Sequence, residues 1–172
     1  MLESAGVSLY GGIYGSGSTA ELPELSPSVR APMEDRECLT VIDLGGNDAG
    51  ARILRQFGKY FTSDEHALMV VVNPCRPETA TAESAAAHIA SVEGALGMSA
   101  AGIVGNAHLL RHTTAQTVLE GERFCQSVSA MTGIPLLCEC YPAPLLGEEQ
   151  LTACRAPLMP VGMYMTESWQ DR

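Results

Sequence analysis

The sequence predicts an α/β fold, with a mostly parallel sheet and helices on both of its faces. From residue 39 onward, short apolar runs alternate with longer stretches in which apolar residues recur at helical spacing. This β-α-β order is typical of parallel sheets. The apolar runs are continuous rather than alternating, as in strands that are buried on both faces. The connections are short, and 172 residues suffice for one domain with a substantial core.

Four strands are expected where the apolar runs end at polar or turn-forming residues, at 39–44, 67–72, 101–105 and 134–140. Three helices are expected between them, at 49–61, 79–96 and 113–131. The first helix has an apolar stripe at Ile53, Leu54, Phe57 and Phe61. The second begins after an N-capping threonine, Thr79 or Thr81, and Gly133 ends the third, because these residues satisfy free backbone groups at helix ends.

Three regions follow from this pattern. Residues 1–38 are rich in glycine, serine and proline and predict a loop-rich segment with one short strand, Val7–Tyr10. Residues 39–145 form the expected α/β core, which resembles a nucleotide-binding core. Residues 146–172 form a tail, with a short helix at 148–154, that packs on the core or extends it.

Composition excludes several classes of function. The formal charge is −10, from 10 basic and 20 acidic residues, so the surface repels phosphate backbones and nucleic acid is not an expected partner. No apolar run is long enough to cross a membrane, and the first residues lack a basic, then apolar, signal sequence, so we expect a cytoplasmic protein. The six cysteines are expected to be free thiols, with a metal or redox role for Cys138 and Cys140 as the weaker alternative.

The candidate catalytic residue is Asp43, which ends the first expected strand and is followed by Gly45 and Gly46. A carboxylate at the end of a parallel strand can hold Mg²⁺ through a water molecule. A glycine amide can approach a terminal phosphate without a Cβ in the way. The alternative is that Asp43 only shapes the turn before the next helix.

Polar residues also follow the next two strands. Asn73 ends one strand, with Arg76 shortly after it, and Asn106 ends the other. Arg76 suits a phosphate, and the Asn106 amide suits a purine base because it both donates and accepts. The alternatives are a local ion pair for Arg76 and an Asx-turn for Asn106. His108 and His112 are interpreted as capping and surface groups rather than catalytic bases.

Residues Gly12–Thr19 match a P-loop except that Ser18 replaces the lysine. Without the lysine the β- and γ-phosphates lose their ammonium partner, and Pro23 prevents the helix that should follow. A plain glycine loop is the favoured interpretation, and a phosphate cradle is the alternative.

Together these motifs resemble the ParA/MinD-type P-loop ATPases, and most closely a bacterial branch of ParA-like ATP-binding proteins. The similarity covers most of residues 6–145 and is carried by four motifs in the family's order. They are residues 41–52, 71–79, 102–109 with 112–114, and 132–135.

The resemblance implies Mg²⁺ and ATP as cofactor and ligand. It gives Asp43, Gly45 and Gly46 the role of the switch that senses the γ-phosphate, and Asn106 the contact to the base. The residues after Asn106 are not Lys-x-Asp, which favours adenine over guanine.

The chain departs from the family in one respect, because the lysine-containing Walker A segment does not precede these motifs. It therefore resembles the carboxyl-terminal portion of such an ATPase, either truncated or a natural remnant. We expect weak nucleotide binding and no hydrolysis by this chain alone. A non-catalytic module that binds a second copy or a partner protein is the main alternative. A Rossmann-type enzyme is disfavoured, because no Gly-x-Gly-x-x-Gly joins a strand to a helix.

Overall fold

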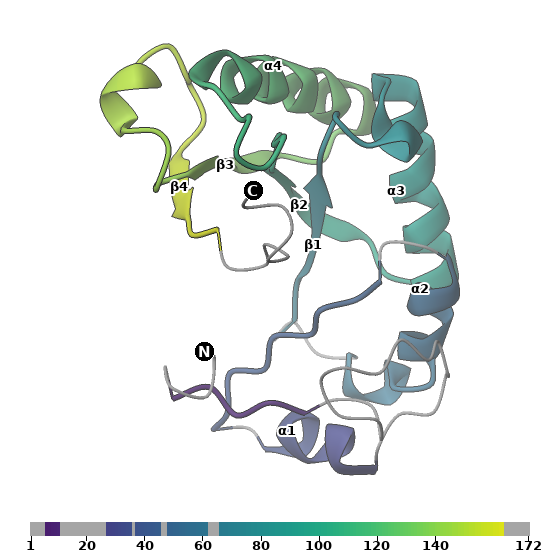
Figure 1. The fold of residues 1–172 in the computed structure, drawn as a ribbon. Helices are drawn as coiled ribbons and strands as arrows, with labels where there is room; N and C mark the ends of the chain where they lie inside the picture. Colours follow the sequence, from purple (N-terminus) through teal and green to yellow (C-terminus); the bar gives the residue numbers. More distant parts are fainter. Residues whose placement is uncertain (1–5, 11–26, 36, 46–47, 62–65, 164–172) are drawn as a thin grey trace. The chain divides into compact units, whose positions relative to one another are not determined.

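The computed structural model describes residues 6–10, 27–35, 37–45, 48–61 and 66–163 (Figure 1). The chain divides into a first unit, Met1–Asp64, and a second unit, Glu65–Arg172. The second unit contains the sheet and the two longest helices. The first unit contains only short helices in its described part.

The second unit is a four-stranded sheet with all strands parallel, which confirms the expected α/β class. The strands are β1 (Leu68–Val72), β2 (Ala100–Gly105), β3 (Leu136–Pro142) and β4 (Leu158–Val161). They pair in the order β1-β2-β3-β4. The connections contain the helices α3 (Ala82–Leu96) and α4 (Ala115–Thr132), and the 3-10 turns η4 (Pro77–Thr79) and η5 (Glu148–Gln150).

The ends of α3 and α4 follow from capping chemistry. The Thr81 side chain accepts a hydrogen bond from the Ser84 amide at 3.1 Å, and Thr114 does the same for α4. Gly133 ends α4 with a left-handed φ of +76°, which glycine adopts without strain. The predictions for Thr81 and Gly133 are therefore confirmed. Among the described helices, none combines the length and apolarity needed to cross a bilayer.

Both long helices pack on the same face of the sheet. One core cluster joins residues of β1, β2, α3 and α4 with Ile134, which lies between α4 and β3. Its other members are Val72, Ala85, Ile89, Ile103, Cys125 and Val128. Figure 1 shows α3 and α4 next to each other beside the strands. Successive crossovers of one hand place their helices on one side when the strands lie in chain order. The expectation of helices on both faces is therefore not met by α3 and α4.

The opposite face of the sheet is apolar and partly exposed. Val70 and Val72 face the helices, so the alternation along β1 turns Met69 and Val71 to the other side. These two side chains are 46% and 61% exposed. Leu137 lies against Gly102 on the same face, and it is 37% exposed.

The strand β4 was not expected from the sequence, because Pro157 and Pro160 interrupt the apolar residues of the tail. A proline lacks the N–H of a ladder hydrogen bond, but an edge strand needs pairing on one side only. β4 is such an edge, with Met159 paired to Cys140 of β3. Residues of the tail thus extend the sheet, whereas the helix expected at 148–154 is only the turn η5.

The first unit is irregular in its described part. It contains the turn η2 (Pro27–Val29), α1 (Arg30–Glu34), α2 (Asp48–Arg55) and the turn η3 (Gly58–Tyr60). The helix expected at 49–61 is therefore shorter than predicted and ends before Gly58.

Two strand predictions in the first unit are wrong. Residues 39–44 and Val7–Tyr10 have no strand structure. Leu39 and Val41 are 92% and 87% exposed, so this apolar run is neither paired nor buried. The segment is attached locally instead, because the Thr40 hydroxyl donates to a backbone carbonyl of α1 at 2.9 Å. A β-strand forms only where a neighbouring strand pairs with it, whereas composition alone determines only the β-propensity of the segment.

Candidate functional site

The carboxyl edge of the sheet collects the polar residues that follow β1 and β2. Asn73 comes directly after β1 and Asn106 directly after β2. The backbone N–H of Asn106 donates to the Val72 carbonyl at 2.9 Å, which places the two strand ends side by side. Ligands of open α/β sheets bind beyond this edge. The candidate functional site is therefore the surface formed by the residues that follow these two strands.

Asn73 has a structural role in the turn after β1. Its Oδ1 atom accepts a hydrogen bond from the Cys75 amide at 2.9 Å. Its backbone carbonyl accepts from the Arg76 amide at 3.1 Å and from the Thr79 hydroxyl at 2.6 Å. The side chain thus forms an Asx-turn. A contact between Asn73 and a nucleotide stays a prediction.

Arg76 and His108 bring charge to this edge. The pKa of His108 is lowered, first by partial burial and then by the nearby positive charge of Arg76. The two side chains are therefore neighbours across the ends of β1 and β2. Arg76 is exposed and forms no ion pair with any carboxylate in the described ranges, contrary to the local pairing that the sequence favoured. Its guanidinium is available to an anion.

The loop that follows β2 spans residues 106–114 and is closely hydrogen-bonded. The buried Thr113 hydroxyl accepts from the Leu109 amide at 2.8 Å and donates to the Leu110 carbonyl at 2.6 Å. Leu110 has a φ of +52°, a conformation that is costly for a residue with a branched side chain. The loop thus stores local strain where it carries Asn106 and His108.

Two buried carboxyl groups lie behind this edge, and neither was predicted from the sequence. Glu139 of β3 is 0% exposed, and Glu122 of α4 is 3% exposed. For Glu139, the signal in the sequence was a glutamate between Cys138 and Cys140 in an otherwise apolar strand. In the structure its register partner in β2 is Gly105. A charged residue in a core strand next to a glycine indicates a buried carboxyl group that needs room.

The three residues of the predicted phosphate switch belong to the first unit. Asp43 and Gly45 are exposed and lie outside regular secondary structure, and Gly46 lies outside the described residues. Within the second unit the structure brings together Asn73, Arg76 and Asn106, and the role of Asp43, Gly45 and Gly46 as a phosphate switch stays a prediction.

Magnesium fits the described residues only in part. No three histidine, cysteine or acidic side chains gather around a common point within the described ranges. Mg²⁺ in nucleotide sites takes one or two carboxylates, with water and phosphate oxygens as the other ligands. A single carboxylate such as Asp43 could therefore serve the ion only together with a bound phosphate.

Three cysteines of the second unit are poorly reactive. Cys125 and Cys140 are buried, and desolvation raises the pKa of each thiol to about 12. Burial raises the pKa of Cys154 to about 11. These thiols stay protonated at neutral pH, whereas nucleophilic and metal-binding cysteines act as thiolates.

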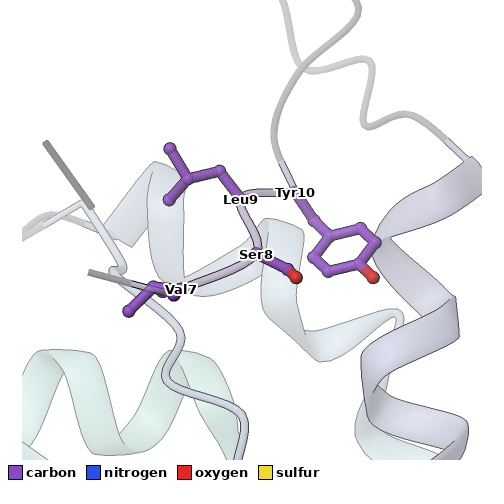
Figure 2. A pocket seen from close by; sticks show the side chains of 5 residues that line it. Val7, Ser8, Leu9 and Tyr10 are labelled. Carbon is purple, nitrogen blue, oxygen red and sulfur yellow. The ribbon is translucent and has the colours of Figure 1, made fainter. Parts of the chain in front are cut away.

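A shallow depression in the first unit carries no functional assignment. It is lined by five consecutive exposed residues, Gly6–Tyr10, without a charged side chain. Figure 2 shows the Leu9 and Tyr10 side chains pointing in different directions rather than toward a common centre. The glycine loop Gly12–Thr19, with its partial P-loop match, lies outside the described residues.

The candidate site therefore rests on the geometry of the sheet edge. Asn73, Arg76, Asn106 and His108 gather there, above two buried glutamates. Comparison of the chain with protein-family models, curated proteins and solved structures finds no match.

Proposed function

We propose that the chain is a ParA/MinD-like ATP-binding domain, or part of one, which binds a nucleotide at the carboxyl edge of its sheet. One observation carries the proposal: Asn73, Arg76, Asn106 and His108 meet where β1 and β2 end. Parallel α/β sheets bind their ligands at this edge.

Each residue would have a distinct role. The exposed guanidinium of Arg76 suits a phosphate group, because it can donate two parallel hydrogen bonds to phosphate oxygens. The amide of Asn106 suits the donor and acceptor pattern of adenine. His108 adds a hydrogen-bonding group whose neutral ring is favoured, because partial burial and the charge of Arg76 lower its pKa.

Affinity is expected to be weak in this chain alone. Arg76 brings one permanent positive charge to the edge, but the net charge of −10 opposes a polyphosphate. The four described strands lie in chain order, so the crevice that forms where strand order reverses is not among them. We expect a dissociation constant on the order of 1 mM for Mg·ATP. Hydrolysis belongs to intact family members by resemblance, not to this chain alone.

NMR titration with Mg·ATP tests this proposal. We expect amide shifts confined to residues 73–80 and 105–114 in the ¹H–¹⁵N spectrum. Replacing Arg76 by glutamine should weaken binding by about tenfold or more, because a hydrogen bond to a charged group contributes about 1.5–3 kcal/mol. Arg123→Gln is the matched control, since Arg123 is an exposed arginine in the middle of α4.

Three results would count against nucleotide binding at this edge. They are unchanged spectra at 10 mM Mg·ATP, shifts that map elsewhere in the second unit, and equal weakening by both arginine substitutions. A preference for GTP over ATP would leave the site in place but contradict the adenine assignment.

A second candidate function is self-association through the open face of the sheet. Met69, Val71, Leu137 and Met159 are between 37% and 61% exposed, and none is charged. An apolar face without charge is complementary to itself, so a second copy of the chain is the occupant that it fits.

Sedimentation velocity tests self-association. We expect the wild type to form dimers in the micromolar range, and Val71→Lys to shift the equilibrium to monomer because a charge would be buried. Lys replacement of exposed Thr152, which lies between η5 and β4, is the control. A wild type that stays monomeric at 100 µM would rule out this candidate.

A further inference from the structure

Glu139 is a fully enclosed carboxyl group with little to neutralise it. Its side chain is 0% exposed and lies behind the start of the 106–114 loop. One oxygen, Oε1, accepts a long hydrogen bond of 3.5 Å from the Ala107 amide. The other oxygen, Oε2, has no hydrogen-bond partner in the part of the chain that the structure describes. A buried carboxylate is normally paired or fully hydrogen-bonded, and Glu139 is neither.

Two glycines make room for this group. A Cβ atom on Gly105 of β2 would collide with the Glu139 carboxyl group. A Cβ atom on Gly121 of α4 would lie 3.1 Å from Glu139 Oε1 and would collide with the Ala107 side chain. The carboxyl group of Glu139 is therefore tightly packed between β2, α4 and the start of the 106–114 loop.

Among the described residues, the charged group that acts on Glu139 has the same sign. Glu122 of α4 accepts hydrogen bonds from the Arg155 amide at 2.7 Å, the Ala156 amide at 2.9 Å and the Gln126 side chain at 2.9 Å. All three donate to Oε1 of Glu122, and none of them bonds to Glu139. The other titratable groups nearby are the thiols of Cys125, Cys138, Cys140 and Cys154. Gly105 and Ala107 on the β2 side and Leu158 of β4 carry no titratable side chain.

This environment favours the neutral acid. Burial, together with the negative charge of Glu122, raises the pKa of Glu139 to about 7, and the Ala107 amide offsets only part of the effect. The protonated form also has an O–H that can donate, whereas the ionised form has two oxygens that require donors. Ionisation therefore creates a buried charge that can be relieved only by admitting water or moving the loop.

We propose that Glu139 is a proton-dependent switch for the 106–114 loop, closed when its carboxyl group is protonated and opened when it ionises. The loop is suited to this role, because it is strained at Leu110 and Ala107 is its direct contact to the carboxyl group. The same loop carries Asn106 and His108, so the switch would couple pH to the carboxyl edge of the sheet. The inference does not depend on nucleotide binding.

Hydrogen exchange of the full chain between pH 6 and pH 8 tests the switch. After correction for the intrinsic pH dependence, we expect protection of the amides of residues 107–113 to fall by about tenfold, in step with the ionised fraction of Glu139. Glu139→Gln should abolish this dependence. Glu120→Gln is the matched control, because Glu120 is an exposed glutamate on the same helix as Glu122.

A second variant keeps the test valid if Glu139→Gln does not fold. Glu122→Gln removes the like charge, so the midpoint of loop opening should move to lower pH. A carboxyl ¹³C titration of Glu139 measures its ionisation directly. The proposal is overturned if Glu139 titrates below pH 5, if loop protection is independent of pH, or if Glu122→Gln leaves the midpoint unchanged.

Discussion

The Glu139→Gln variant is expected to be more stable than the wild type at pH 8 by about 3 kcal/mol, and no more stable at pH 4.5. Burial raises the pKa of Glu139 from 4.5 to about 7, and each unit of difference between the folded and unfolded states corresponds to about 1.4 kcal/mol. A raised carboxyl pKa means that the folded state binds the proton more tightly. The contribution of Glu139 is therefore fully present below pH 4.5 and is lost as pH rises through about 7.

Urea denaturation followed by circular dichroism at a series of pH values measures this effect. The difference in unfolding free energy between the variant and the wild type isolates Glu139, because every other titrating group is common to both. The difference should rise from near zero at pH 4.5 and level off above pH 8. Glu120→Gln should give a flat difference over the same range. Parallel curves for wild type and Glu139→Gln would show that Glu139 ionises normally in the folded state.

The second large effect is a pair of glycine-to-alanine substitutions with opposite signs. Gly94 in α3 and Gly121 in α4 are both helical, and alanine gains about 1 kcal/mol of helix propensity at either position. A Cβ at Gly94 meets no atom within 4 Å, so Gly94→Ala should stabilise the chain by about that amount. A Cβ at Gly121 would collide with Ala107, and overpacking of this kind costs about 1–3 kcal/mol. Gly121→Ala should therefore be net destabilising, by up to about 2 kcal/mol.

Thermal and urea unfolding of the two variants at pH 5 provides the measurement. At that pH Glu139 is protonated, so the comparison reports packing rather than charge. The signs should differ between the variants, with a gap of up to about 3 kcal/mol. A stabilising Gly121→Ala would mean that α4 does not approach Ala107 as closely as described.

The local features of the second unit could be predicted from its sequence. Thr81 and Gly133 marked helix ends because capping depends on residue type at one position, not on distant packing. The three strands predicted in this unit were continuous apolar runs, and each was found within two residues of its expected bounds. Asn73 and Asn106 were placed at one edge because parallel strands end together.

Features that depend on pairing could not be predicted. Leu39–Leu44 has strand propensity, but it forms no strand and most of its residues are exposed, and nothing in the run itself specifies a partner. The strand at Leu158–Val161 was missed because Pro160 disfavours an inner strand but is tolerated at an edge. Whether helices cover one face of the sheet or both depends on the order of the strands, and no single segment of the sequence determines that order.

Only the residues on the surface of the candidate site could be predicted from the sequence, and the buried glutamate behind them could not. Asn106 and Arg76 were found because they follow apolar runs. Glu139 was missed because its burial depends on Gly105 and Gly121, which are distant in sequence and adjacent only in the fold. Asx-turns are a general tendency of asparagine, but the turn at Asn73 is assigned from the hydrogen bond between its Oδ1 atom and the Cys75 amide.

The strand order of the second unit has a consequence for how the chain folds. Each strand pairs with the strand that precedes it in the sequence, and none crosses over an intervening strand. Paired strands are therefore separated in the sequence only by a single connection, which keeps the contact order low for a parallel sheet. Such a unit can be assembled progressively during synthesis, each newly emerged βα segment docking on a template that is already in place. Leu158–Val161 would be the last strand to join, so a ribosome stalled before it should already carry a protease-resistant three-stranded intermediate.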